Sequence, residues 1–277
     1  MKISLAENYG FCFGVKRAIK IAEENQDSRT YGPLIHNAKE IERLHNDFNV
    51  GLTENLSDFH TGETAVIRTH GIPKEELEKL HERQVDVIDA TCPYVTKPQQ
   101  ICEEMSKEGY DIVIFGDEDH PEIKGVKSYA DGNVYTVLHV KDLESIHLKE
   151  KIAIVAQTTR KVEEFLAIAN YLIIRHKEVR VFNTICNATF ENQDAVKDLA
   201  KKSDVMIIIG GKNSSNTKQL QMISLVACSD SYHIESPDEI NSQWFIQKKN
   251  CGISAGASTP DWIIKDVIAK IESITNK

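Results

Sequence analysis

The sequence predicts an α/β protein built from parallel sheets that are covered by helices. Short apolar segments rich in β-branched residues alternate along the chain with longer segments of helical periodicity. A near-continuous apolar strand is typical of a parallel strand buried on both faces, and strand–helix alternation is typical of parallel crossover units. The 277 residues suffice for two domains or three small ones, each with its own core.

Each expected strand is short and dominated by Val, Ile and Ala, whereas each expected helix repeats apolar residues three and four positions apart. The expected strands are residues 2–6, 64–68, 85–90, 111–115, 151–156, 179–182, 204–209 and 251–255. The expected helices are residues 14–25, 39–48, 74–83, 96–109, 162–177, 192–202, 216–227 and 260–273.

Charge and hydropathy exclude several classes of protein. The chain has 33 Lys and Arg against 42 Asp and Glu, a net charge of −9, whereas a nucleic-acid binder usually presents a basic face. No run of about 18 apolar residues is present, as a membrane span would need. The N-terminal stretch MKISLAENYGFCFGVKR lacks the apolar core of a secretory signal. We therefore predict a cytoplasmic protein that contacts neither nucleic acid nor membrane.

Residues able to do chemistry follow the carboxyl ends of the expected strands. The segment 111–115 leads to GDEDHPE, 151–156 leads to QTT, and 204–209 leads to GGKNSSN. Open α/β sheets bind ligands beyond these strand ends. We expect several of these loops to converge on one site.

The cysteines suggest what that site holds. Structural disulfides are rare in the cytosol, and no C-x-x-C is present to form a zinc ribbon, a thioredoxin site or a local ferredoxin pattern. Cys12, Cys92 and Cys186 each lie in a loop that opens a helical segment, 80 and 94 residues apart, about a third of the chain. This spacing predicts three similar α/β units around a pseudo-threefold axis, with a central metal site. The predicted units are residues 14–92, residues 93–182, and residues 183–277 together with 1–13.

The helix dipole favours the ionised form of a thiol near a helix N-terminus, so all three cysteines could ligate a metal as thiolates. Two kinds of metal site would fit three thiolates. One is a zinc site that needs a further ligand, and the other is an iron–sulfur cluster with one open iron. The remaining cysteines, Cys102, Cys228 and Cys251, are expected to be small buried hydrophobes.

Nine motifs occur in order over nearly the whole chain: GFCFGVKRA, IHN, RTHG, DATCPYVTK, HPE, QTT, NTICNAT, KNSSNT and GASTPDWII. Together they resemble the 4-hydroxy-3-methylbut-2-enyl diphosphate reductase family, the last enzyme of the methylerythritol phosphate route to isoprenoids. The resemblance implies a trefoil of three α/β domains around one [4Fe–4S] cluster with three cysteine ligands and one open iron. It implies reductive removal of the substrate's allylic hydroxyl, which gives isopentenyl diphosphate and dimethylallyl diphosphate.

The resemblance also assigns roles to particular residues. Cys12, Cys92 and Cys186 fall on the three cluster ligands. Glu122 is expected to be the proton donor, since burial beside a negative cluster would raise its pKa toward neutrality, and Thr158 would help carry the proton. The diphosphate would be bound by residues that follow strands or begin helices: His36, His70, His120, Ser214, Ser215, Asn216 and Ser258. Taken singly, such serines are also ordinary helix N-caps, and Glu122 a helix-start carboxylate.

Reducing equivalents are expected from outside the chain. GGKNSS fails the Walker A pattern because Met206 and Asn213 occupy required positions, and no G-x-G-x-x-G opens a helix. In the resembling family the donor is a ferredoxin- or flavodoxin-type carrier. The alternatives are a zinc-dependent hydrolase of a phosphorylated substrate and a non-enzymatic iron–sulfur sensor. Two residues depart from the family pattern: Phe13, where other members have a small residue, and Asn192, where many carry Arg.

Overall fold

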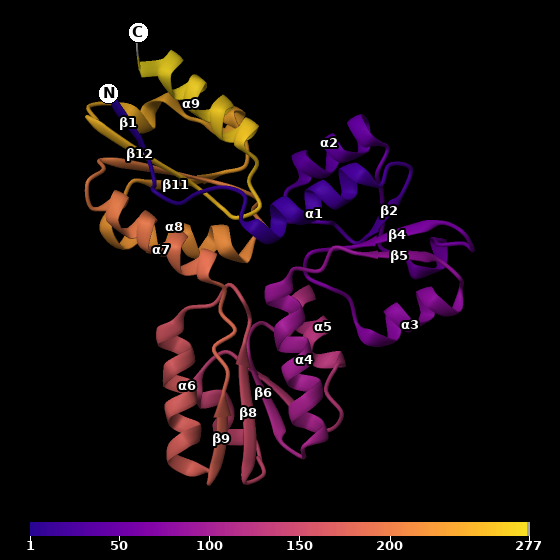
Figure 1. Cartoon of the computed structure of the whole chain (residues 1–277). Helices are drawn as coiled ribbons and strands as arrows, with labels where there is room; N and C mark the ends of the chain where they lie inside the picture. The colour runs from indigo at the N-terminus through magenta and orange to yellow at the C-terminus, as the bar shows by residue number, and fades with distance from the viewer. Residues whose placement is uncertain (276–277) are drawn as a thin grey trace. The chain divides into compact units, whose positions relative to one another are not determined.

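The computed structural model describes residues 1–275 and confirms the α/β class. Its strands form three four-stranded sheets, and all the paired strands of the described residues run parallel (Figure 1). The chain divides into two compact units. Unit 1 contains residues 1–16, 35–43 and 187 onward, and unit 2 contains residues 17–34 and 44–186.

Unit 1 holds one sheet with the strand order β1-β12-β10-β11. These strands are β1 (Lys2–Leu5), β12 (Asn250–Ala255), β10 (Val205–Ile209) and β11 (Ser231–Ile234). Every residue of β10 is buried, because its VMIII sequence is apolar on both faces of the sheet. The helices that belong to this unit are α7 (Asn187–Ala200), α8 (Ser215–Ala227) and α9 (Asp261–Thr275).

Unit 2 holds the other two sheets, with the orders β3-β2-β4-β5 and β7-β6-β8-β9. The first contains β3 (Gly51–Thr53), β2 (Arg29–Tyr31), β4 (Thr64–Ile67) and β5 (Asp86–Asp89). The second contains β7 (Val134–Val137), β6 (Asp111–Phe115), β8 (Lys151–Ala156) and β9 (Glu178–Val181). The helices of unit 2 are α3 (Lys74–Glu82), α4 (Pro93–Lys107), α5 (Pro121–Ser128) and α6 (Val162–Arg175).

Two helices contain residues of both units, namely α1 (Phe13–Glu24) and α2 (Ala38–Phe48). Short 3₁₀ turns occupy Leu56–Asp58, Val140–Ser145, Pro237–Glu239 and Ser242–Phe245. No helix within residues 1–275 is both long enough and apolar enough to cross a membrane. The division into three units that the cysteine spacing predicts, with boundaries near residues 13, 92 and 182, stays a prediction.

The strand register brings the chemistry-bearing loops of unit 2 together. Phe115 at the end of β6 pairs with Ala156 at the end of β8, so the following loops leave the sheet side by side. One loop carries HPE and the other carries QTT. In the other sheet, Ile67 of β4 pairs with Asp89 of β5, which places the RTHG and DATC loops next to each other.

The same relation holds in unit 1. Ile209 ends β10 and pairs with Ala255, which ends β12. The loop with GGKNSS and the loop with GAST therefore begin at neighbouring points of one sheet edge. The convergence expected from the sequence follows from the parallel pairing within each unit.

Among the strands and α-helices of residues 1–275, four strands and one helix were not predicted from the sequence. Strands β2, β3, β7 and β11 contain only three or four residues each, too few for a clear periodicity. Three of them, β3, β7 and β11, lie at sheet edges, where strands carry fewer buried residues. Helix α5 was also missed because it has only eight residues and contains Gly125.

Candidate functional site

Glu122 and Thr158 form a buried pair at the carboxyl edge of the second sheet of unit 2. Glu122 lies in the first turn of α5, where the His120 ring accepts a hydrogen bond from its backbone N–H at 3.2 Å. Pro121 occupies the first helical position, which suits its missing N–H. This local capping turns the Glu122 carboxyl inward, and the residue is 2% exposed.

Two hydrogen bonds join the pair. The backbone N–H of Thr158 donates to Oε1 of Glu122 at 2.7 Å, and the Thr158 hydroxyl donates to Oε2 at 2.8 Å. Burial raises the pKa of Glu122 to about 7, against the opposing effect of these two bonds and of the Arg160 charge. A carboxyl with this pKa can both hold and give up a proton at neutral pH.

The loop that carries Thr158 is held by Gln157. The Gln157 side-chain oxygen accepts hydrogen bonds from the backbone N–H of Asp117 at 3.0 Å and from Nε of Arg160 at 3.1 Å. Gln157 thus ties the loop after β8 to the loop after β6. This role of Gln157 was not predicted, although its position directly after an expected strand was the available signal.

A backbone hydrogen bond connects Thr158 to one of the three singled-out cysteines. The N–H of Cys186 donates to the carbonyl oxygen of Thr158 at 2.9 Å. Cys186, Thr158 and Glu122 therefore form one continuous chain of contacts within unit 2. The backbone of Cys186 is thus tied to the residue that hydrogen-bonds the Glu122 carboxyl.

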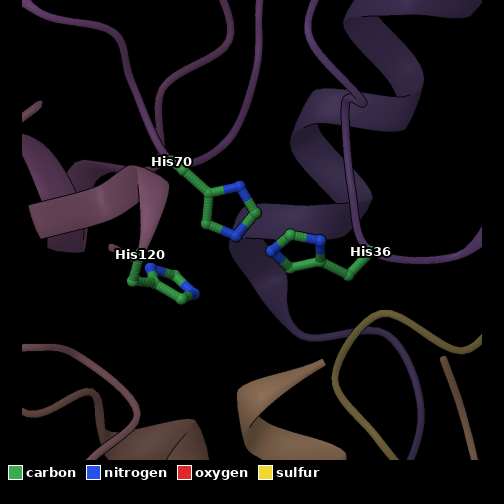
Figure 2. A group of neighbouring side chains, drawn as sticks. All are labelled: His36, His70 and His120. Carbon is green, nitrogen blue, oxygen red and sulfur yellow. The ribbon is translucent and has the colours of Figure 1, made fainter. Parts of the chain in front are cut away.

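Cys92 has a comparable setting in the other sheet of unit 2. It is the N-cap residue of α4, and its backbone N–H donates to the carbonyl oxygen of Thr69 at 3.0 Å. Thr69 precedes His70, so Cys92 adjoins the loop that carries this histidine. The rings of His70 and His120 meet edge to face, with centroids 5.4 Å apart (Figure 2).

Cys12 lies in unit 1, directly before α1. Its backbone N–H donates to the carbonyl oxygen of Ala257 at 3.2 Å, and its own carbonyl accepts the N–H of Lys16. Cys12 therefore adjoins the loop that carries Ser258. Phe13, which departs from the family pattern, is 66% exposed. Its side chain therefore faces mainly solvent. Asn192 is buried within α7.

The six cysteines fall into two physical classes. The thiols of Cys12, Cys92 and Cys186 are half-buried, and each precedes a helix N-terminus. The thiols of Cys102, Cys228 and Cys251 are buried, as predicted. Burial raises the pKa of both Cys102 and Cys251 to about 12, which disfavours the ligating thiolate. The first class has the donor chemistry that an iron–sulfur cluster requires.

Three segments of unit 1 meet around the carbonyl oxygen of His36. The Ser258 hydroxyl donates to this oxygen at 3.4 Å. A Cβ atom at Gly211 would collide with the same oxygen, so only glycine permits this approach. The segments that carry His36, GGKNSS and GAST are thereby brought together.

Asn216 has an unusual environment at the start of α8. It is 5% exposed, and neither its side-chain oxygen nor its nitrogen has a hydrogen-bond partner among residues 1–275. Ser214 caps the same helix, because its hydroxyl oxygen accepts the N–H of Thr217 at 3.3 Å. Buried amides are nearly always hydrogen-bonded, so the Asn216 side chain leaves a donor and an acceptor available to a polar ligand.

Comparisons with known proteins decide the family. The family model described as LytB protein matches residues 3–272. The chain belongs to the LytB family. A LytB relative from Sulfurimonas denitrificans, named 4-hydroxy-3-methylbut-2-enyl diphosphate reductase, is 68% identical over 99% of both chains. A relative of the same name from Campylobacter jejuni subsp. jejuni serotype O:6 is 62% identical over 99% of both chains.

Two solved structures resemble this LytB chain. One is described as (E)-4-hydroxy-3-methyl-but-2-enyl diphosphate reductase, the terminal enzyme of the non-mevalonate pathway. It is 45% identical, covers 98% of this chain and 99% of its own, and has a TM-score of 0.74. The other is a diphosphate reductase from Plasmodium falciparum, 25% identical, with a TM-score of 0.91 over 98% of this chain and 87% of its own.

The comparisons confirm the predicted family and the predicted enzyme class. This LytB chain is an oxidoreductase, a reductase of the non-mevalonate route to isoprenoids. They favour the reductase over the zinc-dependent hydrolase and the iron–sulfur sensor.

Proposed function

We propose that this chain reductively removes the allylic hydroxyl of 4-hydroxy-3-methylbut-2-enyl diphosphate, giving isopentenyl diphosphate and dimethylallyl diphosphate. The observation that carries the proposal is the contact chain from Cys186 through Thr158 to Glu122. Removal of the hydroxyl as water needs two electrons and two protons: one proton goes to the leaving oxygen, and the reduced allyl fragment takes the other at carbon to give either product. The contact chain links the residue that carries a proton-exchanging carboxyl, through Thr158, to the backbone of a cysteine that can ligate a redox metal.

Cys12, Cys92 and Cys186 would hold one [4Fe–4S] cluster with three thiolate ligands and one open iron. When bound, such a cluster supplies a Lewis acid for the hydroxyl oxygen and a path for electrons. The half-buried thiols before helix N-termini fit this group, whereas the buried cysteines do not.

Glu122 would be the general acid. In its protonated form it can donate to the leaving oxygen, and the Thr158 hydroxyl would orient both the carboxyl and the substrate's hydroxymethyl group. Glu122 and Thr158 are both buried, so bulk water has little access to the pair. Exclusion of water strengthens every electrostatic interaction in such a site.

The diphosphate would be bound by short polar side chains and histidines rather than by fixed cations. In unit 1, Ser214, Ser215 and Asn216 offer hydroxyl and amide groups at the N-terminus of α8, where the helix dipole favours an anion. The other residues of this proposed set are Ser258, His36, His70 and His120. Protonated in the field of the ligand, the histidines would act as switchable cations.

Electrons would come from a ferredoxin- or flavodoxin-type carrier, since the sequence lacks the glycine motif of a resident dinucleotide. The proposal is tested by anaerobic iron and sulfide analysis combined with turnover of the diphosphate substrate by a chemical reductant. We expect four irons per chain and release of both isomeric diphosphates. A colourless zinc protein that releases phosphate would instead identify the hydrolase.

A further inference from the structure

Glu40 is a buried carboxylate that none of the roles above uses. It lies in the first turn of α2 and is 1% exposed. Its Oε2 accepts a hydrogen bond from the indole Nε1 of Trp262 at 3.0 Å. Its Oε1 accepts from Nε of Arg43 at 3.0 Å and from Nη2 of Arg43 at 2.6 Å. All three residues belong to unit 1.

A fully buried Glu is rare unless it is paired, and here it is paired on both oxygens. Arg43 lies on the same helix, so this ion pair is local. Trp262 lies in the first turn of α9, 222 residues away in sequence. The Glu40–Trp262 bond therefore joins the N-terminal turns of two different helices.

Both helices begin within three residues of a member of the proposed diphosphate pocket. His36 precedes Asn37, whose side-chain oxygen accepts the backbone N–H of Glu40 at 3.1 Å. Ser258 lies four residues before Trp262, and its hydroxyl reaches the His36 carbonyl at 3.4 Å. Hydrogen bonds to a charged acceptor are about twice as strong as neutral ones. The charge-assisted bond from Trp262 to Glu40 is thus stronger than the neutral bond from Ser258 to the His36 carbonyl.

We propose that Glu40 and Trp262 are positioning residues, which set the spacing of His36 and Ser258 so that both can contact one diphosphate. This inference rests on the proposed function. Neither residue would touch the substrate, and their effect would pass through the first turns of α2 and α9. Loss of the bond should weaken diphosphate binding while the chemical step is retained.

Trp262→Phe is the most direct test, because it removes the N–H donor and keeps an aromatic ring at a site that is 38% exposed. The iron-loaded enzyme should show a KM about tenfold higher, with kcat within about twofold. The dissociation constant of inorganic diphosphate, measured by anaerobic calorimetry, should rise by a similar factor. Trp244→Phe is the matched control, because the ring of Trp244 stacks on Tyr232 and carries no part of this contact.

Substitutions at Glu40 separate positioning from simple support of the fold. Glu40→Gln keeps an oxygen that can accept from Trp262 but removes the charge, so KM should rise less than in Glu40→Leu. Glu40→Leu removes the acceptor and should raise KM about tenfold. The Glu40→Leu, Trp262→Phe double variant should be no worse than Glu40→Leu alone, since both changes break one contact.

The outcomes distinguish this inference from the function on which it rests. Absence of turnover by the wild-type enzyme would overturn the function. Normal wild-type turnover with an unchanged KM and diphosphate affinity in Trp262→Phe would overturn the positioning role alone. A tenfold effect in Trp244→Phe, or a loss of kcat at constant KM, would also contradict it. Circular dichroism establishes that each variant is folded at the assay temperature.

Discussion

Thr158 donates two hydrogen bonds to Glu122, one to each carboxylate oxygen. Both bonds stabilise the ionised form and so lower the pKa of Glu122. Burial acts in the opposite direction and is the largest influence, so the pKa stands at about 7. An exposed glutamic acid would be fully ionised at neutral pH, whereas this one is divided between its two forms.

The first prediction concerns Glu122→Gln. The amide keeps the shape of the carboxyl but has no proton to give at neutral pH. Turnover should fall at least about a hundredfold, the scale of a lost general acid, while iron content and inorganic diphosphate affinity are retained. Steady-state turnover near the wild-type rate would show that the proton comes from another source.

The second prediction is a pH dependence that Thr158 controls. The protonated form of Glu122 is the donor, so activity should be present below about pH 7 and lost as pH rises through the pKa. Thr158→Val removes a hydrogen bond that lowers this pKa, so the loss of activity should shift to higher pH. Thr158→Ser keeps the hydroxyl and should leave the midpoint in place.

The measurement is kcat against pH, with a reductant whose potential is constant over the range. A midpoint that moves to lower pH in Thr158→Val would contradict the assignment. So would an unchanged midpoint in Glu122→Gln.

The third prediction separates the cysteines. Cys12→Ser, Cys92→Ser and Cys186→Ser should each lose the cluster, because a hydroxyl is a poor ligand for the iron of such clusters. The matched controls are Cys102→Ser, Cys228→Ser and Cys251→Ser, whose thiols are buried, and these should keep it. Iron and sulfide per chain are the measurements. Full iron in any variant of the first group would refute that residue as a ligand.

The sequence could predict the convergence of loops because parallel strands share a carboxyl edge. Phe115 pairs with Ala156, and Ile209 pairs with Ala255, so in each pair the two strands end at the same level of the sheet. The loops that follow these strands therefore begin side by side, as predicted. The loops after long apolar strands were therefore located, whereas the role of Thr158 came from the family resemblance of the QTT motif.

Contacts between distant segments could not be predicted in this way. The bond between Glu40 and Trp262 spans 222 residues, and both residues lie within ordinary amphipathic helices. Neither helical periodicity nor residue type marks such a pair. The role of Gln157 was missed for a similar reason, since its partners Asp117 and Arg160 are known only from the folded loops.

The last prediction concerns Asn216, whose buried amide has no hydrogen-bond partner among the described residues. An unsatisfied buried polar group costs about 1–3 kcal/mol. Asn216→Leu removes this group, so the free energy of unfolding without substrate should not fall and should rise by up to about that amount. The same change removes a donor and an acceptor for the diphosphate, so KM should rise at least about tenfold.

Urea denaturation of the substrate-free protein and steady-state kinetics of the iron-loaded enzyme measure the two effects. Asn213→Leu in the same turn is the control, because Asn213 is exposed and should change neither quantity by much. A clear loss of stability in Asn216→Leu would mean that the amide is already bonded in the free protein. An unchanged KM would mean that it does not contact the substrate. Greater stability together with weaker binding is the expected combination, because a site built for an anion leaves polar groups unpaired until the anion arrives.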